Sequence, residues 1–187
     1  MVQVSDKTIS LEEFLKQPET KPASEYINGQ IIQKPMPQGK HSKLRGELVT
    51  VINQLVEDSQ VAMAFPELRC TFGGSSVVPD VTVFAWEQIP VDESGDIANV
   101  FPLPPDWIIE ILSPDQSSTK VTGIILHCLN HGSEMGWLID PKARSILVFP
   151  HGRQPQLLKE PDEILPVPDL VGDLRLSVGD VFSWLKL

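Results

Sequence analysis

Apolar residues recur along the chain with two different periods, and these periods predict its helices and strands. From His41 to Glu57 the apolar positions are separated by four, three, one and three residues. This spacing places them on one face of an amphipathic helix. A second helix is expected from about Ser118 to His131, because Gly132 follows it in the position of a C-terminal cap.

Shorter sequence signals predict the remaining elements. The capping-box spacing of SLEE at residues 10–13 predicts a short opening helix. Asn28-Gly29 between β-favouring residues predicts a hairpin, and the proline-punctuated residues 87–105 are expected to form a loop. Strands are expected in VAMAFPELRCTF, in VVPDVTVFAW (joined to it through GGSS), and in WIIEIL, MGWLID and SILVFP. The order of these elements predicts a central mixed β-sheet flanked by helices, an α/β or α+β fold.

The bulk composition limits the classes of protein to which the chain can belong. Its 187 residues suit one domain, and 41% hydrophobic with 21% charged residues is typical of a soluble globular protein. No apolar run approaches the ~20 residues that span a bilayer, and the N-terminus lacks a signal-peptide pattern. We therefore expect a cytoplasmic protein without a membrane partner. Cys70 and Cys128 have no CxxC spacing and are expected to be buried thiols.

The formal net charge of −10 bears on nucleic-acid binding. Because such binding depends largely on neutralising phosphates, a chain this acidic has no general attraction for nucleic acid. A nucleic-acid function would therefore need a local basic surface. The candidate residues for that surface lie close together in the sequence: Lys34, Lys40, Lys43 and Arg45.

Two acidic residues lie inside strongly apolar strand patterns. Glu110 stands within WIIEIL, and Asp80 follows Pro79 in VVPDVTVF. An ionised carboxylate buried without a partner is strongly destabilising, so a lysine, an arginine or a metal ion must compensate the charge. If the two acids converge from neighbouring strands, their hard oxygen atoms suit Mg²⁺ or Mn²⁺. The alternative is a structural salt bridge without a metal, with Lys120 or Arg69 as the cation.

The order of the elements, together with the segments VPDVTVF, WIIEILSPDQS and GWLIDP, resembles the putative restriction endonuclease family. This family, formerly a domain of unknown function, is abundant in cyanobacteria and belongs to the PD-(D/E)xK nuclease superfamily. The resemblance implies a single restriction-endonuclease-like domain over residues 1–187. Its core would span about residues 22–150, and residues 151–187 would form a C-terminal extension.

The resemblance also assigns site residues. Asp80 answers to the motif aspartate and Glu110 to the motif (D/E), but Leu112 stands where the motif lysine is expected. In this family the lysine looks displaced onto the following helix, which makes Lys120 the candidate. The usual pattern places the lysine about one turn later, where this chain has Ile124.

The function implied by the resemblance is metal-dependent hydrolysis of DNA phosphodiester bonds. Asp80 and Glu110 would hold one or two Mg²⁺ or Mn²⁺ ions, and Lys120 would stabilise the charge that develops on the phosphate. Glu47, near the start of the first long helix, is the candidate for an additional acidic ligand, and His41 lies nearby in sequence. A homodimer is a family-level expectation, because two DNA strands need cutting.

A different class of function stays open beside this one. The chain could be a catalytically degenerate nuclease-fold protein that acts as a binding or assembly module. The acidic charge and Leu112 at the motif lysine position favour this alternative. The two strand acids and the helix lysine favour the endonuclease.

Overall fold

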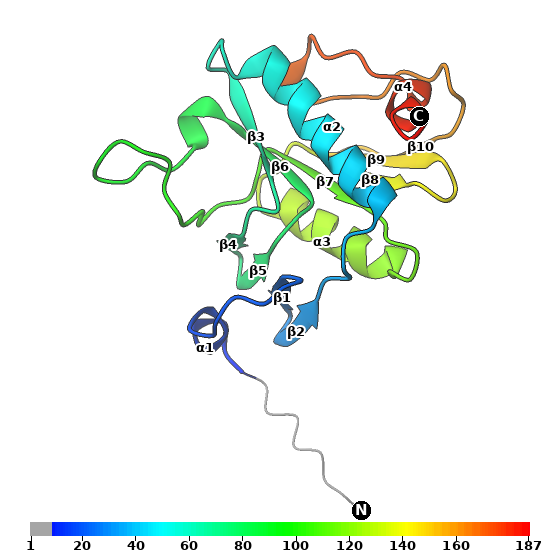
Figure 1. Cartoon of the computed structure of the whole chain (residues 1–187). Helices are drawn as coiled ribbons and strands as arrows, with labels where there is room; N and C mark the ends of the chain where they lie inside the picture. Colours follow the sequence, from blue (N-terminus) through cyan, green and yellow to red (C-terminus); the bar gives the residue numbers. More distant parts are fainter. Residues whose placement is uncertain (1–8) are drawn as a thin grey trace, which may run out of the picture.

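A computed structural model describes residues 9–187 of the chain (Figure 1). Its α-helices are α1 (Leu11–Leu15), α2 (Gly39–Val56), α3 (Ser118–Asn130) and α4 (Val178–Ser183), and two 3-10 turns are η1 (Trp86–Gln88) and η2 (Asp169–Val171). The strands of the first half are β1 (Ser24–Ile27), β2 (Gln30–Gln33), β3 (Ala62–Pro66), β4 (Cys70–Phe72), β5 (Ser75–Val77) and β6 (Val81–Ala85). The strands of the second half are β7 (Trp107–Ile111), β8 (Met135–Asp140), β9 (Ser145–Pro150) and β10 (Gln156–Leu158).

The strands form two sheets, and helices cover the larger one on both faces. The six-stranded sheet has the order β10-β9-β8-β7-β6-β3, in which β7 and β8 are parallel and the other neighbours antiparallel. The smaller sheet has the order β2-β1-β5-β4. The apolar faces of α2 and α4 pack on one side of the large sheet, and α3 packs on the other (Figure 1). This arrangement confirms the mixed α/β fold expected from the sequence.

Strand β7 lies inside the large sheet, between β8 and β6, and all its residues are buried. Trp107, Ile109 and Ile111 join the cluster under α2, while Ile108 joins the cluster under α3. Because side chains alternate along a strand, Glu110 faces the same side as Ile108. A strand covered on both faces explains the continuous apolar run around this single acid.

The structure corrects the expected strand boundaries. The two long segments around residues 62–85 form four strands instead of two, and they pass from the large sheet into the small one and back. Glu67, at φ 47°, turns the chain after β3, and Gly73-Gly74, at φ 56° and 76°, makes the turn between β4 and β5. Such left-handed backbone positions end a strand, because the extended conformation cannot continue through them. The three expected α-helices and the hairpin at Asn28-Gly29 are confirmed.

Two further expectations concern the whole molecule. Over residues 9–187, none of the helices combines the length and the apolar character needed to cross a membrane. Cys70 and Cys128 are both free and buried, as expected. Burial raises the pKa of the Cys70 thiol to about 12, so this group stays protonated and unreactive at neutral pH.

The packing of α3 against β8 gives a testable prediction. Gly136 in β8 leaves no room for a side chain, since a methyl group there would overlap Ile125 Cγ2 of α3. Gly136→Ala should therefore lower the free energy of unfolding by about 1–3 kcal/mol through overpacking. The matched control is Gly46→Ala in α2, where the added methyl group meets open space. It should stabilise the helix by about 0.5–1 kcal/mol, and equal urea midpoints for both variants would contradict this packing.

Candidate functional site

The register of β6 and β7 brings Asp80 and Glu110 together. The two strands are antiparallel, and Val81 at the start of β6 lies opposite Ile109. One position further along, Asp80 therefore stands opposite Glu110, and opposed residues of an antiparallel pair point to the same face. Each of the two residues is 1% exposed. The sheet itself thus forces two carboxylates into one buried place.

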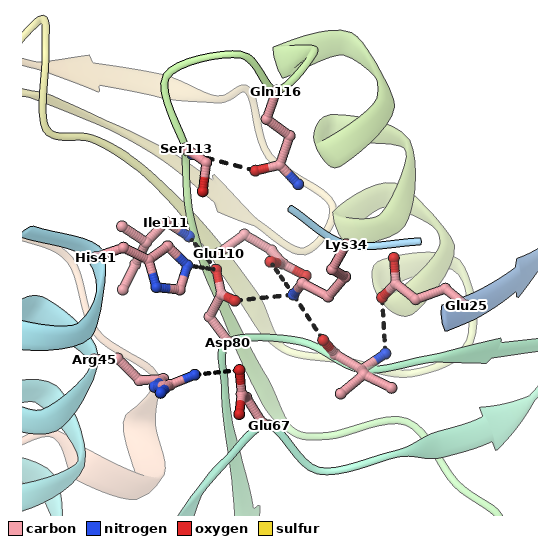
Figure 2. Close-up of polar contacts among 11 residues, drawn as sticks. Glu25, Lys34, His41, Arg45, Glu67, Asp80, Glu110, Ile111, Ser113 and Gln116 are labelled. Atoms are coloured by element: carbon pink, nitrogen blue, oxygen red, sulfur yellow. Dashed lines mark hydrogen bonds and ion pairs between the residues drawn. The ribbon is translucent and has the colours of Figure 1, made fainter. Parts of the chain in front are cut away.

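The cation that meets both carboxylates is Lys34, which follows β2 in the N-terminal hairpin (Figure 2). Its Nζ lies 2.9 Å from Asp80 Oδ1 and 3.3 Å from Glu110 Oε2, and it donates to Val78 O at 2.7 Å. The Lys34 side chain is 9% exposed. The salt-bridge alternative therefore named the wrong cations. Lys34 is the residue that pairs with the two acids, while Arg69 binds Glu19.

The second oxygen of Asp80 is also held in place. Asp80 Oδ2 accepts a hydrogen bond of 2.8 Å from Ile111 N and lies 3.0 Å from His41 Nε2, in the first turns of α2. By contrast, Glu110 Oε1 has no hydrogen-bond partner within residues 9–187. Asp80 is therefore fixed on both sides, whereas Glu110 keeps one buried oxygen free for another ligand.

The electrostatic environment gives the two acids different protonation behaviour. Burial works to raise the pKa of Asp80, but the charge of Lys34 and the contacts with His41 outweigh it and hold that pKa well below its usual range. Burial raises the pKa of Glu110 well above its ordinary value; Lys34 opposes the shift and the charge of Asp80 adds to it. Asp80 therefore loses its proton much more readily than Glu110 does.

A third acid, Glu25 of β1, lies on the other side of Lys34 (Figure 2). It is 3% exposed, and its Oε1 accepts a hydrogen bond of 2.8 Å from Val78 N. Burial works to lower the pKa of Lys34, but the charges of Glu110, Asp80 and Glu25 together raise it. The sequence reasoning missed both Glu25 and the role of Lys34. The signal for Glu25 is the one that revealed Glu110: an acid inside a short β-favouring run.

Lys120 and Glu47 lie apart from the two acids. Lys120 is exposed in the first turn of α3, where it lines a cleft of about 560 Å³ together with Lys34 and Glu25. Glu47 lies on α2 and pairs with Lys43 one turn away. The catalytic role of Lys120 and the metal-binding role of Glu47 stay predictions, and in the structure it is Lys34 that contacts the acids.

The expected basic surface is not formed as predicted. Lys34 is buried on the acids, Lys43 pairs with Glu47, and Arg45 pairs with Glu67. Lys40 is exposed at the start of α2. Lys34 and Arg45 are therefore partners of acidic side chains, while Lys40 and Lys43 lie at the surface.

Two clefts approach the acid pair from different sides. The first, of about 560 Å³, lies between the hairpin and α3 and reaches Lys34 and Glu25. The second, of about 770 Å³, lies at the start of α2 and reaches His41 and Lys142. Asp80 and Glu110 line neither of them. Lys34 contacts both acids and lines the first cleft, and His41 contacts Asp80 and lines the second.

The oxygen atoms around the Lys34 ammonium suit a divalent cation. Asp80 Oδ1, Glu110 Oε2 and Val78 O surround one point, and Glu110 Oε1 is free nearby. Carboxylate and carbonyl oxygens are the ligands that Mg²⁺ and Mn²⁺ prefer. Within residues 9–187 no group of three or more His, Cys, Asp or Glu side chains is placed to hold a metal ion. The donor set therefore fits a hard cation only with two carboxylates and a backbone carbonyl, and only where Lys34 gives up its place.

Comparisons with known proteins agree with this fold. Residues 11–179 match the sequence model of the family Uma2, described as "Putative restriction endonuclease". The fold is similar to a crystal structure from Anabaena variabilis ATCC 29413, described as "a putative nuclease belonging to DUF820", with a TM-score of 0.93. The two chains are 59% identical, and the match covers 95% of this chain and 99% of that one. The search of the curated proteins found no match.

The balance of charges at Glu110 predicts how stability depends on pH. In the unfolded chain Glu110 releases its proton above about pH 4.5, its ordinary pKa. Because the pKa is raised in the folded protein, the folded protein keeps this proton at higher pH. Wild-type stability should then fall with rising pH above that value, by up to about 1.4 kcal/mol per pH unit. Because glutamine does not titrate, Glu110→Gln should gain stability relative to the wild type as the pH rises. Urea unfolding in EDTA across this range measures the difference.

The matched control for the loss of one carboxyl group is Glu57→Gln, at an exposed position. The opposite trend in Glu110→Gln, a loss of relative stability with rising pH, would mean that Glu110 is ionised in the folded protein. Its pairing with Lys34 would then stabilise the fold, and the protonated form of Glu110 would be ruled out.

Proposed function

Because the chain belongs to the family described as putative restriction endonuclease, we propose that it is a metal-dependent DNA endonuclease that hydrolyses phosphodiester bonds. One observation carries the proposal: the carboxylates of Asp80 and Glu110 meet at a buried point surrounded by oxygen atoms. Such a point is where a nuclease needs its cation. The proposal takes Mg²⁺ or Mn²⁺ as that cation.

Each residue of the site has a distinct part in this proposal. Asp80 and Glu110 hold the metal, which when bound polarises the phosphate and lowers the pKa of a bound water. His41 and the amide of Ile111 both contact Oδ2 of Asp80 and orient its carboxylate. Lys120 stands in the cleft that leads to Lys34, so its charge can meet a phosphate oxygen of DNA there.

A second candidate function has its own support. The Lys34 ammonium already fills the position of the cation, and Leu112 replaces the motif lysine. A protein in which Lys34 never leaves would be a degenerate nuclease-fold protein acting as a binding or assembly module.

In either case the expected oligomer is a homodimer, which light scattering coupled to size-exclusion chromatography can test.

Nicking of a supercoiled plasmid separates the two functions. The wild type should nick DNA when Mg²⁺ or Mn²⁺ is added and stop when EDTA is present. Asp80→Asn should reduce the nicking rate on the order of 100-fold or more, because it removes a ligand charge while keeping the shape. Calorimetric titration of Mn²⁺ should show binding to the wild type and much weaker binding to the variant.

The matched control is Asp58→Asn, at an exposed position beyond the end of α2. It should nick and bind Mn²⁺ as the wild type does. A wild type that neither binds Mn²⁺ nor nicks the plasmid favours the binding-module function. Nicking that survives in Asp80→Asn would show that the hydrolysis does not use this site.

A further inference from the structure

We propose that Lys34 is an exchangeable occupant of the cation site, displaced from Asp80 and Glu110 by an entering divalent ion and received by Glu25. This inference rests on the proposed metal-dependent function and concerns the regulation of the same site. It makes the metal-free protein a closed state that opens only when a divalent cation competes successfully with a lysine of the chain itself.

Lys34 and a metal ion cannot share the site. The ammonium lies within 3.3 Å of Asp80 Oδ1, Glu110 Oε2 and Val78 O, the same oxygen atoms that a metal would need. Two cations between the same carboxylates repel each other, and burial leaves little water to screen the repulsion. Binding of the metal therefore requires the ammonium to move away.

The displaced Lys34 side chain has a place to go. It lines the cleft of about 560 Å³ between the hairpin and α3, and Glu25 lines the same cleft. Lysine carries its charge on a flexible stem of four carbons, which allows a swing without movement of the backbone. Displacement into an apolar wall would leave a buried charge unpaired and would be strongly unfavourable. A carboxylate within the same cleft removes this obstacle.

Glu25 is suited to receive the ammonium. It is buried, and it lies on the side of Lys34 away from the two acids, in the cleft that both residues line (Figure 2). Its Oε1 accepts a hydrogen bond from Val78 N. The carbonyl oxygen of the same residue, Val78, accepts one from Lys34 in the closed state. Val78 thus links the two positions between which the ammonium would move.

The exchange has a functional consequence for access. The acids line neither of the two clefts, and Lys34 lies between them and the cleft that contains Lys120. When Lys34 moves to Glu25, the cation site opens toward that cleft. The protein would then be latent at low divalent-ion concentration, with its own lysine as the competing cation.

Mn²⁺ affinity tests the exchange without any measurement of nuclease activity. Lys34→Met removes the competing charge and keeps most of the length of the side chain. The apparent affinity for Mn²⁺ is proportional to the fraction of time that the site is open, and Lys34 lowers this fraction. In calorimetry this variant should therefore bind Mn²⁺ ~10-fold or more tightly than the wild type. Lys186→Met is the matched control, since it removes an exposed lysine that lines a different cleft, away from the two acids, and its Mn²⁺ affinity should stay near the wild-type value.

A second variant tests the receiving position. Glu25→Gln keeps the acceptor for Val78 N but removes the charge that would hold the displaced ammonium. It should weaken Mn²⁺ binding in the wild-type background and have little effect in the Lys34→Met background, because the two residues act through one event. Equal effects in both backgrounds would overturn the role of Glu25. Should Lys34→Met fail to fold, as judged by circular dichroism, an unchanged Mn²⁺ affinity of Glu25→Gln would overturn the exchange by itself.

The outcomes separate this inference from the proposed function. A wild type that nicks DNA, together with a Lys34→Met variant of unchanged Mn²⁺ affinity, overturns the exchange and leaves the endonuclease standing. A wild type that binds Mn²⁺ without nicking DNA, together with a Lys34→Met variant that binds it more tightly, supports the exchange and overturns the endonuclease. A wild type that binds no Mn²⁺ while Lys34→Met binds it shows that Lys34 does not give way, and so overturns the exchange. Failure of both proteins to bind Mn²⁺ overturns the exchange.

Discussion

At the centre of the protein the ammonium group of Lys34 lies between two carboxylates that the pairing of β6 and β7 places on one face of the sheet. Two buried acids without a cation would be strongly destabilising, so the fold needs this contact or a substitute for it. The same contact joins distant parts of the chain. The N-terminal hairpin supplies Lys34, the large sheet supplies Asp80 and Glu110, and α2 supplies His41. The site therefore lies where the small sheet, the large sheet and the first long helix meet.

The two candidate functions make different use of the two carboxylates and of the ammonium between them. If it stays, the acids are a structural ion pair in a nuclease fold, and the molecule can serve as a binding or assembly module. If it gives way to a divalent ion, the same oxygen atoms become a metal site for phosphodiester hydrolysis. Among residues 9–187, one oxygen of Glu110 has no hydrogen-bond partner, and burial raises the pKa of this residue. One lysine therefore does not fully satisfy the site. Glu25, on the other side of Lys34, gives the lysine an alternative partner.

Much of the fold and half of the site could be predicted from the sequence, because those features are local. Helical spacing, the Asn28-Gly29 turn and the two acids inside apolar strands can each be recognised within about ten residues. The contacts of Lys34 cannot, since they span 46 residues to Asp80 and 76 residues to Glu110. Lys120 is the lysine nearest to Glu110 in sequence, whereas the lysine that contacts Glu110 in the structure comes from the N-terminal hairpin. The extra strand boundaries were missed because they depend on a left-handed conformation at Glu67, for which glutamate gives no sequence signal.

The most direct measurement is the anomalous diffraction of crystals grown without metal and then soaked in Mn²⁺. Exchange of Lys34 for the ion predicts an anomalous peak between Asp80 Oδ1 and Glu110 Oε2, in the place where the Lys34 ammonium lies before the soak, with that side chain turned toward Glu25. A map in which Lys34 still bridges the two carboxylates at saturating Mn²⁺, with no peak beside them, would contradict the exchange. The carboxylates would then be a permanent ion pair of the core.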